Sequence, residues 1–141
     1  MAEARDLDHV FVYGTLRPRH APPALENLLR HAANLGEASV PGLLYDLGPY
    51  PAAVAPPTGW QVFRVFGEVL RFAGPPSWLA ELDAYEGFDP ASQETSLFVR
   101  TPCTATLQTG DAGRCWIYLY RGRPCASARI ASGRWQPSVL R

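Results

Sequence analysis

One glutamate, Glu86, has a sequence position that could support acid–base chemistry. It ends the segment 75–86, which begins with two prolines and a serine and has the apolar period of an amphipathic helix. With about 100° per residue, Glu86 falls about 40° from Leu82, inside the predicted apolar face. Glu81 and Asp83 fall about 100° from Leu82 on opposite flanks, where water can reach them. Glu86 is therefore the acidic residue of this helix that we predict to point toward the core. The predicted buried face consists of Trp78, Leu79, Leu82 and Tyr85.

The chemistry expected of Glu86 follows from its place in the last helical turn. Gly87 comes next and can end the helix in the left-handed conformation. The negative end of the helix dipole and burial against Tyr85 and Phe88 both disfavour an ionised carboxylate, so both raise its pKa. A carboxyl group with such a pKa can accept a proton and later return it, as a general base and general acid. The alternative is a glutamate on a frayed turn that swings out to solvent.

Two further carboxylates are weaker candidates for the same role. Glu68 alternates in phase with Phe66, Leu70 and Phe72 of a predicted strand, so it too could face inward. We rank it second, because a glutamate near the end of a sheet is usually solvated. Asp46 is a third candidate.

A second stretch, 10–16, could bind an anion. Three strand-forming residues, Val10 to Val12, lead into Tyr13-Gly14-Thr15-Leu16, where Gly14 marks a turn or a close approach of the backbone. A buried strand that ends in this way can present a row of backbone N–H groups to a carboxylate or an oxyanion. The alternative is an ordinary core strand followed by a glycine turn.

The rest of the composition points to few other chemistries. The sequence has no G-x-S-x-G elbow, no P-loop and no G-x-G-x-x-G. Its three cysteines, Cys103, Cys115 and Cys125, lack C-x-x-C spacing, and no histidine has a partner at ligand spacing, so we expect no metal site. The formal net charge is +0, which removes the main electrostatic argument for nucleic acid or an anionic membrane.

The polar start of the chain and the lack of a long apolar run predict a soluble, cytoplasmic protein. All 13 basic residues are arginines, a usage typical of GC-rich bacterial genomes.

The elements that must position these residues form a mixed pattern of strands and helices. The 141 residues are predicted to form one domain, of α+β class, built as a small mixed β-barrel or sheet. Gly67 is expected to mark a bulge or a close approach, and Trp135 to anchor an irregular tail. Strands are predicted at 10–12, within 38–47 as two short strands or one bent strand, and at 61–72, 97–107 and 115–120, with a small apolar run at 52–54; helices are predicted from Pro23 to residues 34–36 and over 75–86.

Taken together, the strand leading into Tyr13-Gly14-Thr15-Leu16 and the downstream Leu82-Asp83-Ala84-Tyr85-Glu86-Gly87 resemble the γ-glutamylcyclotransferase-like family, which includes the AIG2-like proteins. Four weaker matches extend the resemblance over nearly the whole chain. They are 48–52, 65–70, Ile117-Tyr118 and 132–135.

This resemblance implies a mixed β-barrel with flanking helices and a pocket between the opening loop and Glu86. It also implies an activity, in which the α-amine of a γ-glutamyl group attacks its own side-chain carbonyl and releases 5-oxoproline and an amine or amino acid. Glu86 would be catalytic, and no metal or cofactor would be needed. The implied substrate-binding residues are Tyr13, Gly14, Thr15, Leu16, Tyr50 and Tyr118.

Two other functions fit the same pocket. One is a small-ligand-binding or interaction module without turnover, and the other is related acyl chemistry such as removal of a γ-glutamyl protecting group. The sequence assigns no leaving group, no oligomeric state and no role to Arg100.

Overall fold

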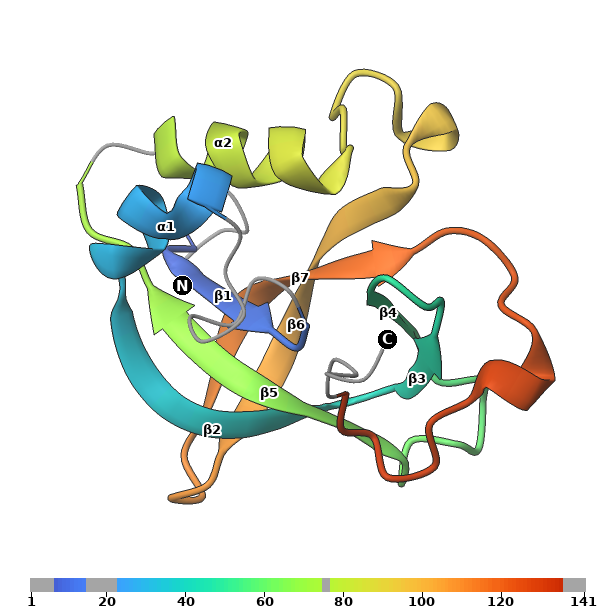
Figure 1. The fold of residues 1–141 in the computed structure, drawn as a ribbon. Helices are drawn as coiled ribbons and strands as arrows, with labels where there is room; N and C mark the ends of the chain where they lie inside the picture. The colour runs from blue at the N-terminus through green and yellow to red at the C-terminus, as the bar shows by residue number, and fades with distance from the viewer. Residues whose placement is uncertain (1–6, 15–22, 75–76, 136–141) are drawn as a thin grey trace.

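The computed structural model describes residues 7–14, 23–74 and 77–135, and its centre is a closed five-stranded barrel (Figure 1). The barrel closes because β1 pairs in parallel with β7 at Val10 and Trp116, whereas its other strand pairs are antiparallel. The barrel and its two helices confirm the predicted α+β mixed-barrel class. In their order around the barrel the strands are β1 (His9–Val12), β5 (Arg64–Arg71), β2 (Ala33–Pro41), β6 (Phe98–Leu107) and β7 (Ala112–Tyr120).

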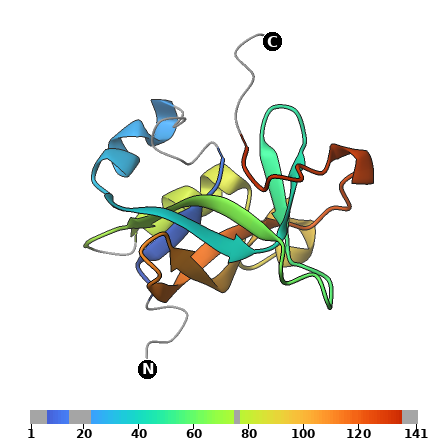
Figure 2. The ribbon, with the colours of Figure 1, turned by 90° about the horizontal axis from the view of Figure 1, so that it is seen from below.

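A separate hairpin of β3 (Leu43–Asp46) and β4 (Pro51–Val54) stands beside the barrel (Figure 2). The region predicted as two short strands or one bent strand is thus two strands, which belong to different sheets. The C-terminal segment returns to this hairpin, because the Ile130 N–H group donates to the Leu44 carbonyl oxygen at 2.7 Å. Trp135 is buried and serves as the predicted anchor of that segment.

Two α-helices, α1 (Pro23–Arg30) and α2 (Ser77–Glu86), lie over the same side of the barrel (Figure 1). The alternation of strand residues explains how the barrel packs on both of its faces. Phe11 points into the barrel, whereas its neighbours Val10 and Val12 pack with α2 residues such as Leu82 on the outer face. Short 3₁₀ helices occur at η3 (Gln93–Thr95) and η4 (Ala126–Ala128). Among the described ranges, no helix is both long enough and apolar enough to cross a membrane.

Gly67 marks a close approach of two strands, as the sequence predicts. A Cβ atom at this position would lie 2.1 Å from the carbonyl oxygen of Val12 on the paired strand β1. A side chain would therefore push β1 away from β5, just before the strand exit that leads to Gly14. The glycine at this position keeps the two strands in register there.

Several predicted boundaries are wrong. The first helix ends at Arg30, not at 34–36, because Ala33 and the residues after it pair with β5 as part of β2. The strand predicted over 61–72 starts at Arg64 and ends at Arg71, and the predicted strand residues Val62 and Phe63 lie in an exposed loop before it. The strand predicted to begin at Cys115 begins at Ala112, because its pairing with β6 extends to the hairpin turn.

The predicted burial of α2 is wrong at two positions. The helical period predicts a buried Tyr85 and an Asp83 that faces water, whereas Tyr85 is 39% exposed and Asp83 is only 7% exposed. Glu86 is consequently not the only acidic residue of this helix that faces the protein interior. The cause lies outside the helix, since Asp83 contacts side chains of β6 and β7.

Candidate functional site

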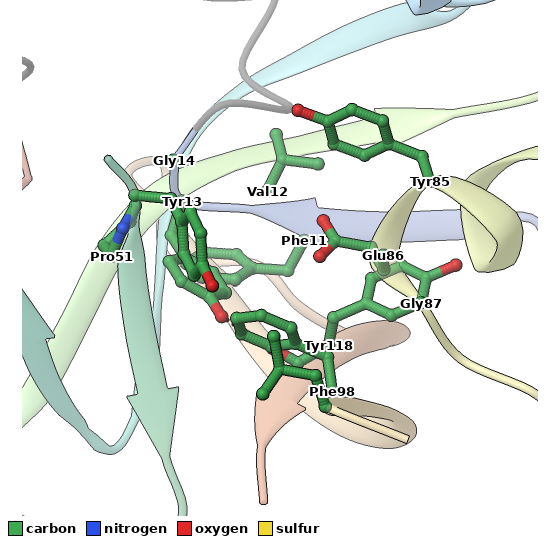
Figure 3. A pocket seen from close by; sticks show the side chains of 12 residues that line it. Phe11, Val12, Tyr13, Gly14, Pro51, Tyr85, Glu86, Gly87, Phe98 and Tyr118 are labelled. Carbon is green, nitrogen blue, oxygen red and sulfur yellow. Dashed lines mark hydrogen bonds between the residues drawn. The ribbon is translucent and has the colours of Figure 1, made fainter. Parts of the chain in front are cut away.

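A pocket of about 350 Å³ lies where the exit of β1, the end of α2 and the hairpin β3–β4 meet the strands β6 and β7 (Figure 3). Its walls are mostly apolar and aromatic, and Glu86 contributes the carboxyl group. A pocket with these features suits one small molecule oriented by a few polar groups. The lining residues are Phe11, Val12, Tyr13, Gly14, Tyr50, Pro51, Tyr85, Glu86, Gly87, Leu97, Phe98 and Tyr118.

The end of α2 is fixed by a Schellman motif, so Glu86 does not lie on a frayed turn. Gly87 has a φ of 72°, in the left-handed region that favours glycine. Its N–H group donates to the Ala84 carbonyl oxygen at 3.3 Å, and the Phe88 N–H group donates to the Asp83 carbonyl oxygen at 2.9 Å. These two bonds satisfy carbonyl groups at the helix end and hold Glu86 at its last position.

The Glu86 carboxyl group points from the helix end into the pocket, toward Tyr13 (Figure 3). Burial among the pocket residues raises its pKa from the ordinary 4.5 to about 7. Within the described part of the chain, no hydrogen bond or ion pair stabilises its charged form. The group is thus close to half ionised at neutral pH, which is the condition for accepting and returning protons there.

The structure brings most of the predicted site residues together. Glu86, Tyr13, Gly14, Tyr50 and Tyr118 all line this one pocket. Their functional roles remain predictions, and Thr15 and Leu16 lie outside the described residues.

The competing carboxylates have other partners. Glu68 is half-buried on β5, where its Oε2 accepts a hydrogen bond from the Asn34 side-chain amide at 2.8 Å. The Oδ1 atom of Asp46 accepts the Gly48 N–H group at 2.8 Å, which is a turn contact. Neither residue lines the pocket, so Glu86 has the position that acid–base chemistry needs.

At the opposite wall, Tyr13 and Gly14 are held tightly against the hairpin. The Tyr13 hydroxyl donates to the Tyr118 carbonyl oxygen at 2.6 Å and accepts the Ala53 N–H group at 3.3 Å. Burial and the nearby Glu86 raise the Tyr13 pKa, so the hydroxyl keeps its proton. A Cβ atom at Gly14 would lie 2.5 Å from the Cγ atom of Pro51, and glycine therefore lets the backbone reach the pocket.

Asp83 and Arg100 form a buried network beside the pocket that sequence reasoning missed. Arg100 donates to Asp83 from Nε at 2.9 Å and from Nη2 at 3.3 Å, and the Tyr118 hydroxyl donates to the Asp83 Oδ1 atom at 2.7 Å. Burial and then this bond to Asp83 raise the Tyr118 pKa. One signal could have found the pair, because an arginine inside a predicted strand, as Arg100 is, needs an anionic partner when it is buried.

The cysteines give no sign of a metal centre in the described residues, where no group of three or more His, Cys, Asp and Glu side chains could hold an ion. Cys103 and Cys115 are paired across β6 and β7 as free thiols, with their Sγ atoms 3.6 Å apart.

Comparison with known proteins gives a family and a set of related folds. The family model described as "Gamma-glutamyl cyclotransferase, AIG2-like" matches residues 10–137. A search of curated proteins found no match. Among solved structures, YkqA from Bacillus subtilis is 23% identical with a TM-score of 0.63; the match covers 91% of this chain and 39% of that one, so the chain spans well under half of YkqA.

Two other solved structures are covered over most of their length. An AIG2-like protein from mouse is 21% identical with a TM-score of 0.63, covering 92% of this chain and 88% of that one. A structure titled "Gamma-glutamyl cyclotransferase" is 18% identical with a TM-score of 0.57, covering 85% and 72%. At these identities the likeness shows a common fold, and it agrees with the barrel and two helices described above.

Proposed function

The chain belongs to the AIG2-like γ-glutamyl cyclotransferase family, and we propose that it cyclises the γ-glutamyl group of a small molecule to 5-oxoproline. In this reaction the α-amine nitrogen attacks the γ-carbonyl carbon, and a new C–N bond closes a five-membered ring. The bond from that carbon to the leaving nitrogen then breaks and releases an amine or amino acid. Water is not consumed, so the products together contain the atoms of the substrate.

The observation that carries this proposal is the carboxyl group of Glu86 in the pocket, with its pKa raised to about 7. The α-amine of the substrate is protonated at neutral pH and must lose protons before and during attack. The leaving nitrogen must gain one before it departs as an amine. Ionised Glu86 takes the proton from the attacking amine, and protonated Glu86 then gives a proton to the leaving nitrogen.

The opposite wall has the complementary task of holding the rest of the γ-glutamyl group. In this proposal, backbone N–H groups of residues 13–16 bind the α-carboxylate or the oxyanion that forms on the attacked carbonyl. The close packing of Gly14 against Pro51 supports this role, because it leaves the backbone exposed to the pocket without a side chain. Tyr50 and Tyr118 form aromatic walls around the substrate.

Ring closure itself needs little beyond orientation and proton transfer. The amine and the carbonyl carbon belong to the same molecule, so attack is already unimolecular. A pocket of about 350 Å³ is small enough to favour a folded conformer of the substrate over an extended one. The protein then supplies the base and the acid at the two nitrogen atoms.

The direct test is to replace Glu86 with Gln and measure 5-oxoproline release by mass spectrometry from a panel of γ-glutamyl dipeptides and γ-glutamyl amines. The wild type is expected to release 5-oxoproline from at least one compound, and Glu86→Gln to lower kcat by about 10²–10⁴-fold. Glu81→Gln is the matched control, since Glu81 is exposed on the same helix and is expected to retain activity.

Other outcomes would refute this function. Full activity in Glu86→Gln would exclude the carboxyl group as the base. Binding of γ-glutamyl compounds to the wild type without any ring product would favour a binding module. Release of free glutamate in place of 5-oxoproline would show hydrolysis of the γ-glutamyl group.

A further inference from the structure

Asp83 and Arg100 have no role in the reaction proposed above, yet their hydrogen-bond network lies at the helix end that carries Glu86. Asp83 is three residues before Glu86, so the two residues lie about one helical turn apart. Arg100 is on β6 and Tyr118 is on β7. Of these partners, Tyr118 also lines the pocket. The network thus connects the end of α2 to two barrel strands next to the base.

Four hydrogen bonds converge on Asp83 and fix this helix end from two directions. Its carboxylate accepts two bonds from Arg100 and one from Tyr118, and its backbone carbonyl accepts the Phe88 N–H group of the Schellman motif. The Arg100 guanidinium group also stacks on two rings, 4.3 Å from the centre of Trp116 and 5.5 Å from that of Phe88. In Figure 1 the end of α2 lies above β6 and β7, the strands that supply these partners.

Tyr118 is affected by the charges of both this network and Glu86. The negative charges of Asp83 and Glu86 both raise the pKa of Tyr118, and the positive charge of Arg100 lowers it. The titratable groups near Glu86 in the described residues come from several elements. The tyrosines are Tyr13 just after β1, Tyr50 of the hairpin turn, Tyr85 of α2 and Tyr118 of β7, and the acidic and basic groups are Asp83 and Arg100.

We propose that Asp83 and Arg100 act as a positioning pair for Glu86. The pair anchors the helix end, and its two opposite charges cancel each other beside the base. This inference rests on the proposed function, because it assigns the pair a task in the same reaction. Burial leaves Glu86 sensitive to any nearby uncompensated charge. The Asp83–Arg100 pair supplies a rigid anchor whose two charges offset each other at the base.

The proposal predicts shifts of opposite sign for the two halves of the pair. Arg100→Gln leaves the negative charge of Asp83 alone, which disfavours ionised Glu86 and raises its pKa further above 7. Asp83→Asn leaves the positive charge of Arg100 alone, which favours ionised Glu86 and lowers its pKa. Each shift is expected to be about one pH unit. The double variant carries neither charge and is expected to titrate as the wild type does.

The experiment is a ¹³C NMR titration of the glutamate side-chain carboxyl groups in the full chain, with the Glu86 signal assigned from Glu86→Gln. The two single variants keep hydrogen-bonding groups of similar size, and sucrose favours the folded state if a variant is marginally stable. Arg100→Lys retains the charge but loses the two-point contact, so it is expected to leave the Glu86 midpoint in place while lowering stability.

Arg71→Gln is the control for the loss of an arginine as such, because Arg71 pairs with Asp8 in an exposed ion pair. It is expected to leave the Glu86 midpoint unchanged. Shifts in opposite directions in Arg100→Gln and Asp83→Asn would support the positioning pair. Two shifts of the same sign, or no shift in folded variants, would overturn it and show a purely structural contact.

The titration uses no substrate, so its failure can be told apart from failure of the proposed function. Lack of 5-oxoproline from the wild type would refute the cyclotransferase reaction, whatever the titration shows. In an active enzyme the rising limb of kcat/KM against pH should move with the Glu86 midpoint in each variant. A limb that stays in place while the midpoint moves would exclude the pair from the reaction.

Discussion

The two carboxylates that face inward from α2, Asp83 and Glu86, have opposite environments although only one helical turn separates them. Asp83 accepts three side-chain hydrogen bonds, two of them from a cation. Glu86 faces an open pocket, and within the described residues no hydrogen bond or ion pair reaches its carboxyl group. One inward-facing carboxylate is therefore satisfied by hydrogen bonds, whereas burial of the other raises its pKa to about 7.

If the proposed reaction holds, this difference lets one element serve both stability and chemistry. A buried carboxylate is costly unless it is paired, and natural proteins place unpaired ones mainly where function requires them. The paired Asp83 holds the helix end in place, and the unpaired Glu86 is available to react. In our proposal the anchor and the base are close because the anchor fixes the direction in which the base points.

The largest expected effect comes from removing the carboxyl group of Asp83, which is the hydrogen-bonded one of the two. Asp83→Ala leaves the Arg100 guanidinium group buried without its anionic partner, so we expect a loss of about 3–5 kcal/mol in the free energy of unfolding. Urea unfolding followed by circular dichroism measures this quantity. Asp8→Ala is the matched control, because Asp8 pairs with Arg71 at the surface and its loss should cost less than about 1 kcal/mol.

The two ion pairs differ in exposure, and this difference is the reason to expect different losses in the free energy of unfolding. The side chains of Arg100 and Asp83 are 15% and 10% exposed, whereas those of Arg71 and Asp8 are 57% and 44% exposed. Similar losses in Asp83→Ala and Asp8→Ala would contradict the view that burial makes Asp83 the anchor of α2.

The sequence predicted Glu86 better than Asp83 because of where their constraints arise. The inward direction of Glu86 depends on the helical period and on Gly87 next to it, which are local features. Asp83 turns inward because Arg100 and Tyr118 meet it from strands 17 and 35 residues away in sequence. A helical wheel considers only the spacing of residues within the helix and not their partners on other strands. It therefore predicts that Asp83 faces water and that Tyr85 faces the core.

The same distinction between local signals and contacts distant in sequence applies to the fold. The family and the mixed-barrel class, which the resemblance implied, are confirmed. The start of β2 at Ala33 was missed, because strand pairing with β5 overrides the helical tendency of an Ala-rich and Leu-rich segment. The contact of the Tyr13 hydroxyl with Tyr118 spans 105 residues and has no local signal. The roles of the pocket residues stay predictions until activity is measured.

An intermediate effect on stability is expected from neutralising Glu86, the second of the two inward-facing carboxylates. Because the folded state raises the Glu86 pKa from 4.5 to about 7, the folded chain binds this proton more tightly than the unfolded chain does. The contribution of Glu86 to stability therefore falls as the pH rises between these values. Glu86→Gln avoids the cost of the buried charge and should stabilise the protein by about 1–3 kcal/mol at pH 8.

The stability difference between Glu86→Gln and the wild type should nearly vanish at pH 4, where the wild-type carboxyl group is protonated in both states. Urea unfolding at pH 4, 6 and 8 measures the trend, with Glu81→Gln as a control for losing an exposed charge on the same helix. A difference that stays constant across this range would mean that burial does not perturb Glu86.

The smallest effect concerns the rate of the wild-type reaction at different pH values. If Glu86 acts as the base, kcat/KM should rise with pH through a midpoint near its pKa of about 7. Between pH 8 and pH 6 the ionised fraction falls by about tenfold, and kcat/KM should fall by at least that factor. Initial rates of 5-oxoproline release at low substrate concentration measure this profile.

Deprotonation of the substrate amine adds its own dependence at higher pH, so the comparison should use two γ-glutamyl compounds whose α-amines differ in pKa. A limb near pH 7 that stays in place in both compounds would belong to the enzyme, because a limb caused by the substrate would move with the pKa of its α-amine. A midpoint of the kcat/KM profile near 4.5 would mean that the environment of Glu86 favours its charged form as much as water does. The difference between Asp83 and Glu86 described above would then be wrong.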